Sequence, residues 1–384
     1  MKIVELNNRP GARTVENNST TTILPQQKDV SPSVKALSID ASNNKNDVSE
    51  KVLKVMLQQS SQHPQTGTVP FMVSILPDSL QSAFKEVFLD AFPQYTVAGS
   101  VLWAKNGGYT TSFEQQIESL ASAAPLPDIL ITQDFNCLYH RNFKNNLLNK
   151  NNFETLQLPL HPAYVDQKIA HPCGLLSILA TDALVLVANK MKFDIKRLPS
   201  EWYELLHPVF HKSIALCSEP KSFCKTVFYH FIKVYGYDGV KQLIGNMSEQ
   251  LTPEAMLATI RSGKPTDTAV YVMPYSYAQK IEDKINYKVI WPNDGALLIP
   301  IQLLVKKGAY RQHQEVIKFL TGEIAGKIFE RQGLLATHPD TCREYPQHKL
   351  SWMGWNFLEN SNLAIMKEDI ITILARAKQT GKRK

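Results

Sequence analysis

The spacing of apolar residues becomes regular at Val69. Residues 69–76 (VPFMVSIL) form an almost continuous apolar run, as in a buried strand. Residues 78–92 follow with leucine, phenylalanine and valine at helical spacing, and Asp78 and Gln81 fit a cap on the first turn. A strand that leads directly into a capped helix is typical of α/β proteins.

The alternation of strands and helices continues to residue 307. We predict further strands over 96–104, 127–132, 183–190, 213–218, 269–274 and 296–307, with helices over 113–123 and 222–236 and a helix and turn over 201–210. There is no internal repeat. The pattern therefore predicts an α/β fold.

Residues 1–66 lack this pattern. Tracts such as NNSTTTILPQQ bury too little apolar surface to offset the entropy lost on ordering, so we expect a mostly disordered segment. One exception is a short helix near 47–59, where Val48, Val52 and Met56 fall on one face.

The most apolar run, Ala183 to Ala188, is too short to span a membrane. Asp182 precedes it and Asn189 and Lys190 follow, whereas a transmembrane helix needs ~20 apolar residues. The first residues show no apolar stretch of the length that a secretory signal requires. As written, the sequence predicts a cytoplasmic protein; a start codon further upstream would make it periplasmic or extracytoplasmic.

The chain has 384 residues, 43% hydrophobic and 20% charged, which is a globular balance long enough for two domains. Its net charge is +7, but five basic residues lie within positions 376–384, so the rest of the chain is close to neutral. A short basic tail after a helix is usually solvated. We therefore expect no nucleic-acid partner.

Cysteine and histidine give weak signals for chemistry. The five cysteines include no CxxC pair, which predicts reduced thiols. His171 and Cys173 make at most half of a metal site, and Pro208 separates His207 from His211 on any helix. The common catalytic and phosphate-binding motifs are absent from the sequence, so we predict no metal, no cofactor and no enzymatic activity.

Three strand-to-helix junctions could bind a ligand, because helix N–H groups and the positive end of the helix dipole meet there. They are Leu76–Ser79, Thr132–Asp134 and residues 218–225. In the third junction, Ser222 is the predicted N-cap, either as a plain cap or as part of an anion site.

The sequence allows two interpretations of the role of Cys224. A thiol in a first helical turn beside Lys221 and Lys225 could be a nucleophile or redox sensor, and it could equally be a small packing residue. The sequence offers no base beside it, because His230 lies off the same helical face.

Tyr275 and Tyr277 follow a predicted buried strand and would share one face if the chain stayed extended. Packing, contact with an organic ligand and ferric-ion binding all suit such a pair. Asn293-Asp294-Gly295 has the composition of a tight turn, and the strand after it is long enough to cross between lobes.

The order of segments resembles the solute-binding proteins of ABC transporters. The resemblance rests on ALVLVANK, SEWYELLHPVFHKSIAL, SFCKTVFYHFIKVYG, TAVYVMPYSYA, VIWPNDGALLIPIQLLVKKG and EVIKFLTGEIAGKIFERQGL, and it covers roughly residues 68–345. The nearest cluster is the type II periplasmic binding proteins related to iron(III), thiamine and aminoethylphosphonate binders. The iron binders use neighbouring tyrosines where this chain has Tyr275-Ser276-Tyr277.

The resemblance implies two α/β lobes that close on a ligand by a hinge. It implies a first lobe from residues 67–180 and 296–384, a second lobe from 181–295, and a cleft between them. The ligand contacts that it implies are Asp78, Ser79, Thr132, Gln133, Ser222, Phe223, Met273, Tyr275, Asp294 and Ala296.

The implied function is capture of a small anionic or zwitterionic solute by a monomer, with an ABC permease as partner if the protein is exported. Two alternatives stay open at this point: a cytoplasmic sensor or adaptor, and an enzyme on the same fold that uses Cys224, Asp78 or Asp134.

Overall fold

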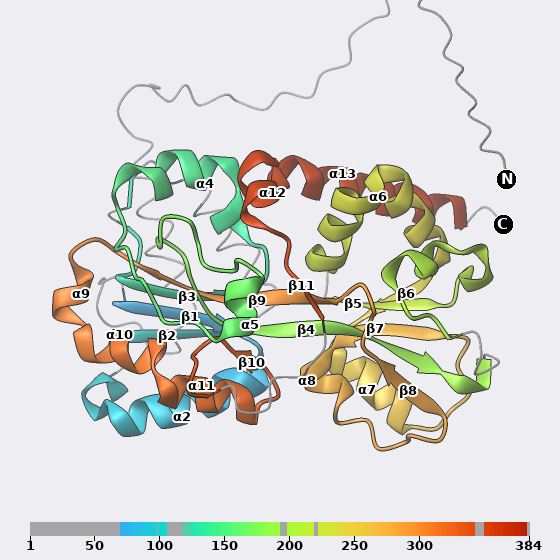
Figure 1. Ribbon diagram of the computed structural model, residues 1–384, viewed down its shortest axis with the longest axis horizontal. Coiled ribbons are helices and arrows are strands. Elements are labelled where there is room, and N and C mark those ends of the chain that lie inside the picture. The colour runs from blue at the N-terminus through green and yellow to red at the C-terminus, as the bar shows by residue number, and fades with distance from the viewer. Residues whose placement is uncertain are drawn as a thin grey trace, which may run out of the picture. The chain divides into compact units, whose positions relative to one another are not determined.

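A mixed β-sheet forms the centre of the protein. The computed structural model describes residues 70–381 except positions 98, 106–116, 118–119, 121, 124, 193–197, 219–221 and 342–348. Within these residues the sheet has 11 strands in the order β2-β1-β3-β9-β4-β7-β5-β6, with β8 and β10 paired to β4 and β11 paired to β9 (Figure 1). The strands are β1 (Met72–Leu76), β2 (Val101–Lys105), β3 (Ile129–Gln133), β4 (Ser177–Asn189), β5 (Ile214–Cys217), β6 (Met247–Leu251), β7 (Val270–Pro274), β8 (Tyr287–Ile290), β9 (Ala296–Val305), β10 (Leu335–Ala336) and β11 (Leu350–Ser351).

Two long antiparallel strands join the two ends of this sheet. The first half of β4, Ser177–Leu184, pairs with β9, and its second half pairs with β7 and β8. The last residues of β9 pair in turn with β3, which leads on to β1 and β2. All residues of β4 and β9 are buried. The β1–β3 group and the β5–β8 group are thus connected within the sheet through β4 and β9.

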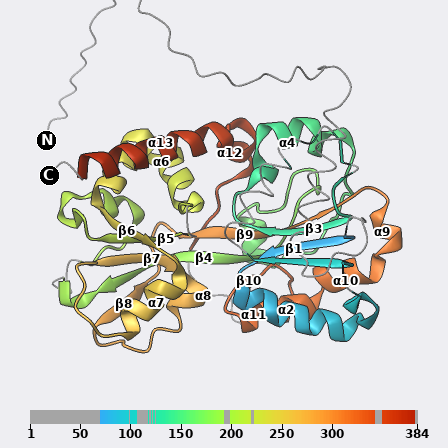
Figure 2. The ribbon, with the colours of Figure 1, turned by 180° about the vertical axis from the view of Figure 1, so that it is seen from behind.

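Helices cover both faces of the sheet (Figures 1 and 2). On one face lie α4, α6, α12 and α13, and on the other lie α2, α7, α8, α10 and α11. Under α2, α10 and α11, the rings of Phe84, Phe88, Phe319 and Phe329 pack together. The helices are α2 (Asp78–Ala91), α4 (Arg141–Asn146), α5 (Pro162–Asp166), α6 (Lys225–Asn246), α7 (Pro253–Arg261), α8 (Tyr275–Ala278), α9 (Ala309–Gln312), α10 (Gln314–Thr321), α11 (Glu323–Arg331), α12 (Trp355–Asn360) and α13 (Leu363–Gly381).

The predicted strands at 69–76, 127–132, 213–218, 269–274 and 296–307 are confirmed, as is the helix at 78–92. The strand expected at 183–190 begins earlier, at Ser177, because residues 177–182 pair with β9. The strand expected at 96–104 begins only at Val101, and 201–210 forms two short 3₁₀ helices, Trp202–Leu206 and Pro208–Phe210. The helix near 47–59 lies outside the described residues, as does the helix at 113–123 apart from isolated positions.

Two predicted helix caps are wrong. Pro77, not Asp78, is the N-cap of α2, and the N-cap makes no side-chain hydrogen bond. The N-cap of α6 is Cys224 and not Ser222, since the helix begins three residues later than predicted, at Lys225.

The last two helices contact both ends of the sheet. In α12, Trp355 Nε1 donates to the Ile169 carbonyl oxygen (3.0 Å), and Lys144 Nζ donates to the Leu358 carbonyl oxygen (2.7 Å). By contrast, α13 packs on α6, where Tyr237 donates its hydroxyl hydrogen to Asp369 (2.7 Å). The C-terminal helix therefore lies against an element of residues 181–295, although the expected lobe division groups it with residues 67–180. Within the described chain, no helix has the length and apolar composition needed to cross a membrane.

Asp182 is a buried carboxylate in the middle of β4. It accepts hydrogen bonds from Ser276 Oγ (2.5 Å), from the Ser276 backbone N–H (3.2 Å) and from the Ala183 backbone N–H (2.8 Å). Burial raises its pKa to about 6, because desolvation of the charge outweighs these hydrogen bonds. The carboxylate thus joins the crossing strand to the first turn of α8.

We expect this carboxylate to make stability fall as pH rises from about 4 to about 6. The folded protein keeps the Asp182 proton up to about pH 6, whereas the unfolded chain releases it near pH 3.8, so the folded state binds more protons in this window. The difference of about two pKa units corresponds to about 3 kcal/mol. Asp182→Asn removes this part of the pH dependence.

Urea denaturation at a series of pH values measures the effect. Asp238→Asn, on an exposed position of α6, is the control and should keep the wild-type fall. An Asp182→Asn profile parallel to that of the wild type would contradict the assignment.

Gly295 forms the tight turn before β9 in a conformation that only glycine adopts freely. Its φ is +107°, and a Cβ would lie 3.0 Å from the Leu350 carbonyl carbon. Trp202 donates its backbone N–H to Asp294 (3.1 Å) and its indole N–H to the Gly295 carbonyl oxygen (2.8 Å). The predicted tight turn is confirmed, and it anchors the 3₁₀ helix that begins at Trp202.

Gly295→Ala should destabilise the fold by about 1–3 kcal/mol, because the added methyl meets backbone atoms that cannot move aside. Gly263→Ala is the matched control, since Gly263 also has a positive φ (+60°) but an open surrounding. Urea denaturation of both variants should give a larger loss for Gly295→Ala. Equal losses would mean that φ alone, and not the contact with Leu350, sets the cost.

Candidate ligand-binding site

Asp134 follows β3 and adopts a left-handed conformation with φ of +66°. Its backbone is held from several sides: its N–H donates to the Pro300 carbonyl oxygen (2.9 Å), and its carbonyl oxygen accepts from Gln302 Nε2 (2.8 Å) and the Asn136 N–H (3.0 Å). A non-glycine residue stays in this region when its surroundings fix it, and such residues cluster at functional sites.

Gln302 on β9 organises the polar atoms beside Asp134. Its amide nitrogen also donates to Thr132 Oγ1 (2.9 Å), and its amide oxygen accepts from the Tyr139 hydroxyl (2.8 Å). Asn136 Nδ2 donates to the same Thr132 oxygen (2.8 Å). Burial and the nearby charge of Asp134 raise the pKa of Tyr139 well above its usual value, so Tyr139 stays a neutral donor.

The first turn of α6 reaches this group. Thr226 Oγ1 donates to Asp134 Oδ1 (2.9 Å), across 92 positions of sequence. The Cys224 N-cap makes no side-chain capping bond, and Lys225 is the first helical residue. The positive end of the dipole of the first segment of α6, which runs from Lys225 to a break in helical geometry at Gly236, therefore lies close to the Asp134 carboxylate.

A second carboxylate, Asp182, lies near the end of β5. The charges of Asp134 and Asp182 both act on the thiol of Cys217, at the end of β5. We refer to Thr132, Asp134, Asp182, Thr226, Ser276 and Gln302 as the polar cluster. It lies where β4 and β9 pass between the two groups of strands.

Some of the predicted contact residues come together here. Thr132 belongs to the polar cluster and Gln133 precedes Asp134, while the half-buried Ser222 lies just before α6. Phe223 is buried, and its ring packs on Phe228 (5.5 Å between centroids) and Tyr229 (6.4 Å). Asp78 and Ser79 open α2, and their side chains lie outside the described part of the chain.

Three other predicted contacts lie elsewhere in this conformation. The side chains of Met273 and Ala296 are fully buried within β7 and β9. Asp294 accepts from the Trp202 N–H in the turn before β9, and burial raises its pKa. Tyr275, the remaining predicted contact, packs against Trp291.

Residues 275–278 do not stay extended, so the shared face that an extended chain would give the two tyrosines is not formed. Residues 275–278 form the helical turn α8, which directs the two phenols apart. Tyr275 makes an edge contact with Trp291 (5.3 Å between centroids). Tyr277 donates its hydroxyl hydrogen to Glu254, and Lys280 Nζ lies 5.0 Å from its ring centroid. The two phenols do not form one iron-binding face.

Histidine and cysteine form no metal-binding cluster of three or more groups within the described residues. His171 Nδ1 accepts from the Cys173 backbone N–H (3.1 Å), and its ring packs on Trp355. Burial lowers its pKa to about 4, so it is neutral at neutral pH. His207 caps the 3₁₀ helix Pro208–Phe210.

The predicted contacts omitted most of the polar cluster. Asp134 belongs to the second predicted strand-to-helix junction and is a possible catalytic carboxylate, but it is not among the predicted contacts; nor are Gln302, Thr226, Asp182 and Ser276. A signal was present for Asp182 and Gln302: each is a polar residue within an otherwise apolar, buried strand. Thr226 and Ser276 carried no such signal, because serine and threonine are common in first helical turns.

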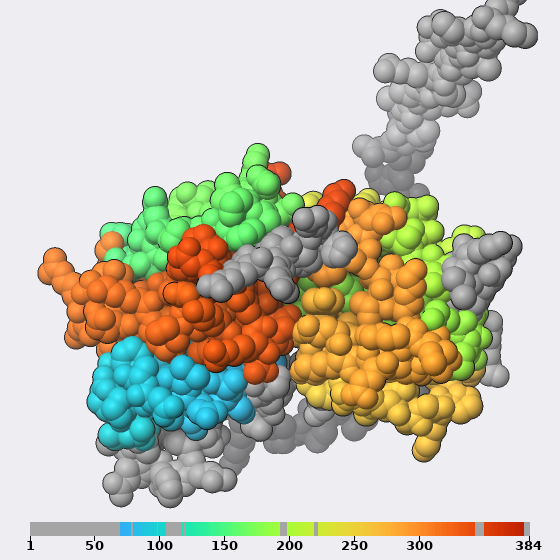
Figure 3. Space-filling model, turned by 60° about the horizontal axis from the view of Figure 1, so that its bottom comes forward, coloured from blue at the N-terminus to red at the C-terminus, as the bar shows by residue number. Residues whose placement is uncertain are grey.

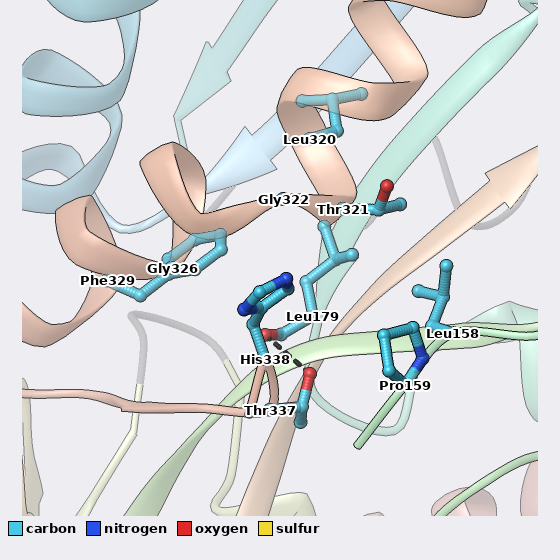
Figure 4. A pocket seen from close by; sticks show the side chains of 10 residues that line it. All are labelled: Leu158, Pro159, Leu179, Leu320, Thr321, Gly322, Gly326, Phe329, Thr337 and His338. Atoms are coloured by element: carbon cyan, nitrogen blue, oxygen red, sulfur yellow. Dashed lines mark hydrogen bonds between the residues drawn. The ribbon is translucent and has the colours of Figure 1, made fainter. Parts of the chain in front are cut away.

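A separate hollow lies beside α11 and shares no residue with the polar cluster. Figure 4 shows Gly322 and Gly326 on one side and Thr337 and His338 on the other, with Thr337 Oγ1 donating to the Leu179 carbonyl oxygen (2.9 Å). Its volume of about 10 Å³ holds no more than about one water molecule. In the space-filling view, the surface that includes α2 and α11 meets the surface that includes α7 and α8 along a narrow seam (Figure 3).

Solved structures share this fold. The periplasmic binding protein P5PA matches with a TM-score of 0.57 and 15% identity, over 80% of this chain and 99% of its own. The ferric binding protein of Campylobacter jejuni matches with a TM-score of 0.55 and 14% identity, over 80% and 99%. AfuA of Actinobacillus pleuropneumoniae, solved with fructose-6-phosphate, gives 0.54 and 14%, over 80% and 97%. The fold is that of the type II periplasmic binding proteins, as the sequence resemblance implied.

No curated protein matches the chain. The sequence profile of the bacterial extracellular solute-binding proteins matches residues 124–361, which is more than half of the chain. This family consists of binding proteins rather than enzymes, so the catalytic alternative for Cys224, Asp78 or Asp134 is set aside. By this match and by its fold, the chain belongs to the bacterial extracellular solute-binding protein family.

Proposed function

We propose that the protein captures a small zwitterionic or anionic solute at the polar cluster and delivers it to an ABC permease. The observation that carries the proposal is the hydrogen bond between Thr226 and Asp134, which joins the end of β3 to the first turn of α6. Ligands of open α/β sheets bind at the carboxyl ends of strands and at helix N-termini, and both lie here.

The charges of the site favour a solute that has an anionic group at one end and an ammonium or hydroxyl group at the other. The N-terminal turn of α6, with Lys225, suits a carboxylate or phosphate group. The carboxylate of Asp134 suits an ammonium group or a hydroxyl donor. A zwitterion satisfies both ends at once, and an anion with hydroxyl groups is the next best fit.

The residues that we propose to contact the solute lie at the end of β3 and at the starts of α6 and α2. They are Thr132, Gln133 and Asp134 after β3, Ser222 and Thr226 around the start of α6, and the backbone at Asp78 and Ser79 where α2 begins.

The proposed motion is a rotation of two lobes, one built on β1–β3 and one on β5–β8. In this proposal the second lobe is residues 181–295. The first lobe is residues 67–180 and 296–345; residues 346–384, which the resemblance places in the first lobe, are left out because α13 packs on α6. The strands β4 and β9 would bend between them, since they pass from one group of strands to the other.

The proposed location is outside the cytoplasm, because that is where the named family acts. Transport requires a permease to receive the solute, and we propose that the protein meets it as a monomer.

A panel of solutes tests the class of ligand. We expect 2-aminoethylphosphonate or fructose 6-phosphate to raise the Tm of the full chain by several degrees, since a ligand at 100 times its Kd stabilises by about 2.7 kcal/mol. Thiamine and ferric ion are the cationic members of the panel and should have little effect. Stabilisation by the cations alone would overturn the proposed charge preference.

Before this measurement, the protein is unfolded and refolded to remove any solute carried over from the host. Native mass spectrometry before and after this treatment, with extraction of the released compound, identifies a bound solute even when the panel does not contain it. A chain that carries nothing and responds to no member of the panel would count against solute capture.

Asp134→Asn tests the position of the site. We expect it to weaken binding of the stabilising solute by about tenfold or more, because a charge-assisted hydrogen bond contributes about 1.5–3 kcal/mol. Isothermal titration calorimetry gives the Kd. Asp238→Asn, which also removes one carboxylate but on the exposed face of α6, is the control and should leave the Kd unchanged. Equal affinities of the wild type and Asp134→Asn would move the site away from β3.

A further inference from the structure

Two cysteines that are seven positions apart in the sequence lie side by side in the fold. Cys217 is the last residue of β5 and Cys224 is the N-cap of α6, and their sulfur atoms are 3.7 Å apart. Both are buried free thiols. The expectation of unrelated reduced thiols missed this contact, because the sequence does not show that the end of β5 and the start of α6 meet.

The backbone on either side of the pair is fixed. The N–H of Ser218, next to Cys217, donates to the Leu251 carbonyl oxygen (2.8 Å). Beyond Cys224, Thr226 is bonded to Asp134, and Phe223 packs on the rings of Phe228 and Tyr229. The two thiols are therefore held beside each other by structure that does not depend on a bond between them, which gives them a high effective concentration.

We propose that Cys217 and Cys224 form a reversible intramolecular disulfide that ties the end of β5 to the first turn of α6. A disulfide requires an S–S distance of about 2.0 Å, so each sulfur has to move by less than about 1 Å. The family to which the chain belongs is extracellular, and disulfides form and persist in such compartments.

The bond forms by two exchange steps with a small disulfide such as oxidised glutathione. The Cys224 sulfur loses its proton and attacks one glutathione sulfur; the glutathione S–S bond breaks, and the other half leaves as a thiol with a proton. Cys217 then loses its proton and attacks the Cys224 sulfur, which releases the second glutathione as a thiol. The two protein thiols are oxidised by two electrons, and one glutathione disulfide is reduced to two thiols.

The surroundings of Cys217 decide the order of these steps. The hydrogen bond with Cys224, burial and the charges of Asp134 and Asp182 raise the pKa of Cys217 well above its usual value. A thiol that keeps its proton is a poor first nucleophile, so Cys224 attacks first and Cys217 resolves the mixed disulfide.

The disulfide would fix the start of α6, where the proposed solute site lies. An effect on solute affinity rests on the proposed function, whereas the disulfide does not. The test therefore detects the bond itself and needs no solute.

Tryptic digestion separates the two cysteines, because Lys221 lies between them: Cys217 falls in peptide 213–221 and Cys224 in peptide 222–225. The native full chain is treated with oxidised glutathione until the exposed Cys173 is fully modified, then denatured, alkylated and digested. Mass spectrometry should find the two peptides joined by a disulfide, and dithiothreitol should separate them. Recovery of both cysteines alkylated, or each with its own glutathione, would overturn the proposal.

Single variants provide matched controls. In Cys217→Ser, Cys224 should keep a glutathione adduct, because the thiol that resolves it is gone. In Cys224→Ser, Cys217 should stay unmodified and be recovered alkylated. Cys173→Ser should leave the joined peptides unchanged. Loss of the joined peptides in Cys173→Ser would show that the bond arises by exchange through Cys173 and would overturn the proposed direct route.

Discussion

The antiparallel pairing of β4 with β9 connects the two groups of strands. The β1–β3 group reaches the rest of the sheet through β9, and the β5–β8 group reaches it through β4. Both strands are buried along their whole length, so their backbone groups have to be paired with each other or with buried side chains. Pro300, opposite Thr181, has no N–H to donate to this ladder, while its carbonyl oxygen accepts from Asp134.

The polar cluster is built around this point. Asp182 in β4 and Gln302 in β9 bring a carboxylate and an amide into strands that are otherwise apolar. Each is satisfied by several hydrogen bonds, as buried polar groups require. The same bonds position Ser276 at the start of α8 and Asp134 at the end of β3. The elements that carry the proposed solute contacts are therefore held by side chains of the two crossing strands.

The sequence was sufficient to predict the fold class and most strands, because an apolar run such as 69–76 that leads into a helix of clear spacing such as 78–92 is typical of a strand. The family resemblance was needed for the arrangement of the strands, since β3 and β9 are separated by more than 160 residues. Local chemistry was less reliable at helix starts. Ser222 has the side chain of a cap but lies outside α6, and Tyr275 opens a helical turn rather than an extended segment.

The site could be predicted only in part, for a physical reason. Thr132 and Gln133 were predicted as contacts because they end a recognisable strand. Gln302 and Thr226 gain their roles from partners more than 90 positions away, Thr132 and Asp134. No local pattern contains such a pairing. The contact between Cys217 and Cys224 is hidden in the same way, although only six residues separate them.

The C-terminal helices add a mechanical link outside the sheet. Trp355 and Lys144 hold α12 beside the β1–β3 group, and α6 holds α13 beside the β5–β8 group. After β4 and β9, these two helices form a third connection between the groups, and we refer to α12 and α13 together as the strap. A rotation of one group against the other has to bend this strap at Ser361 and Asn362, the two residues between its helices. In the proposed rotation, the strap would therefore resist opening together with β4 and β9.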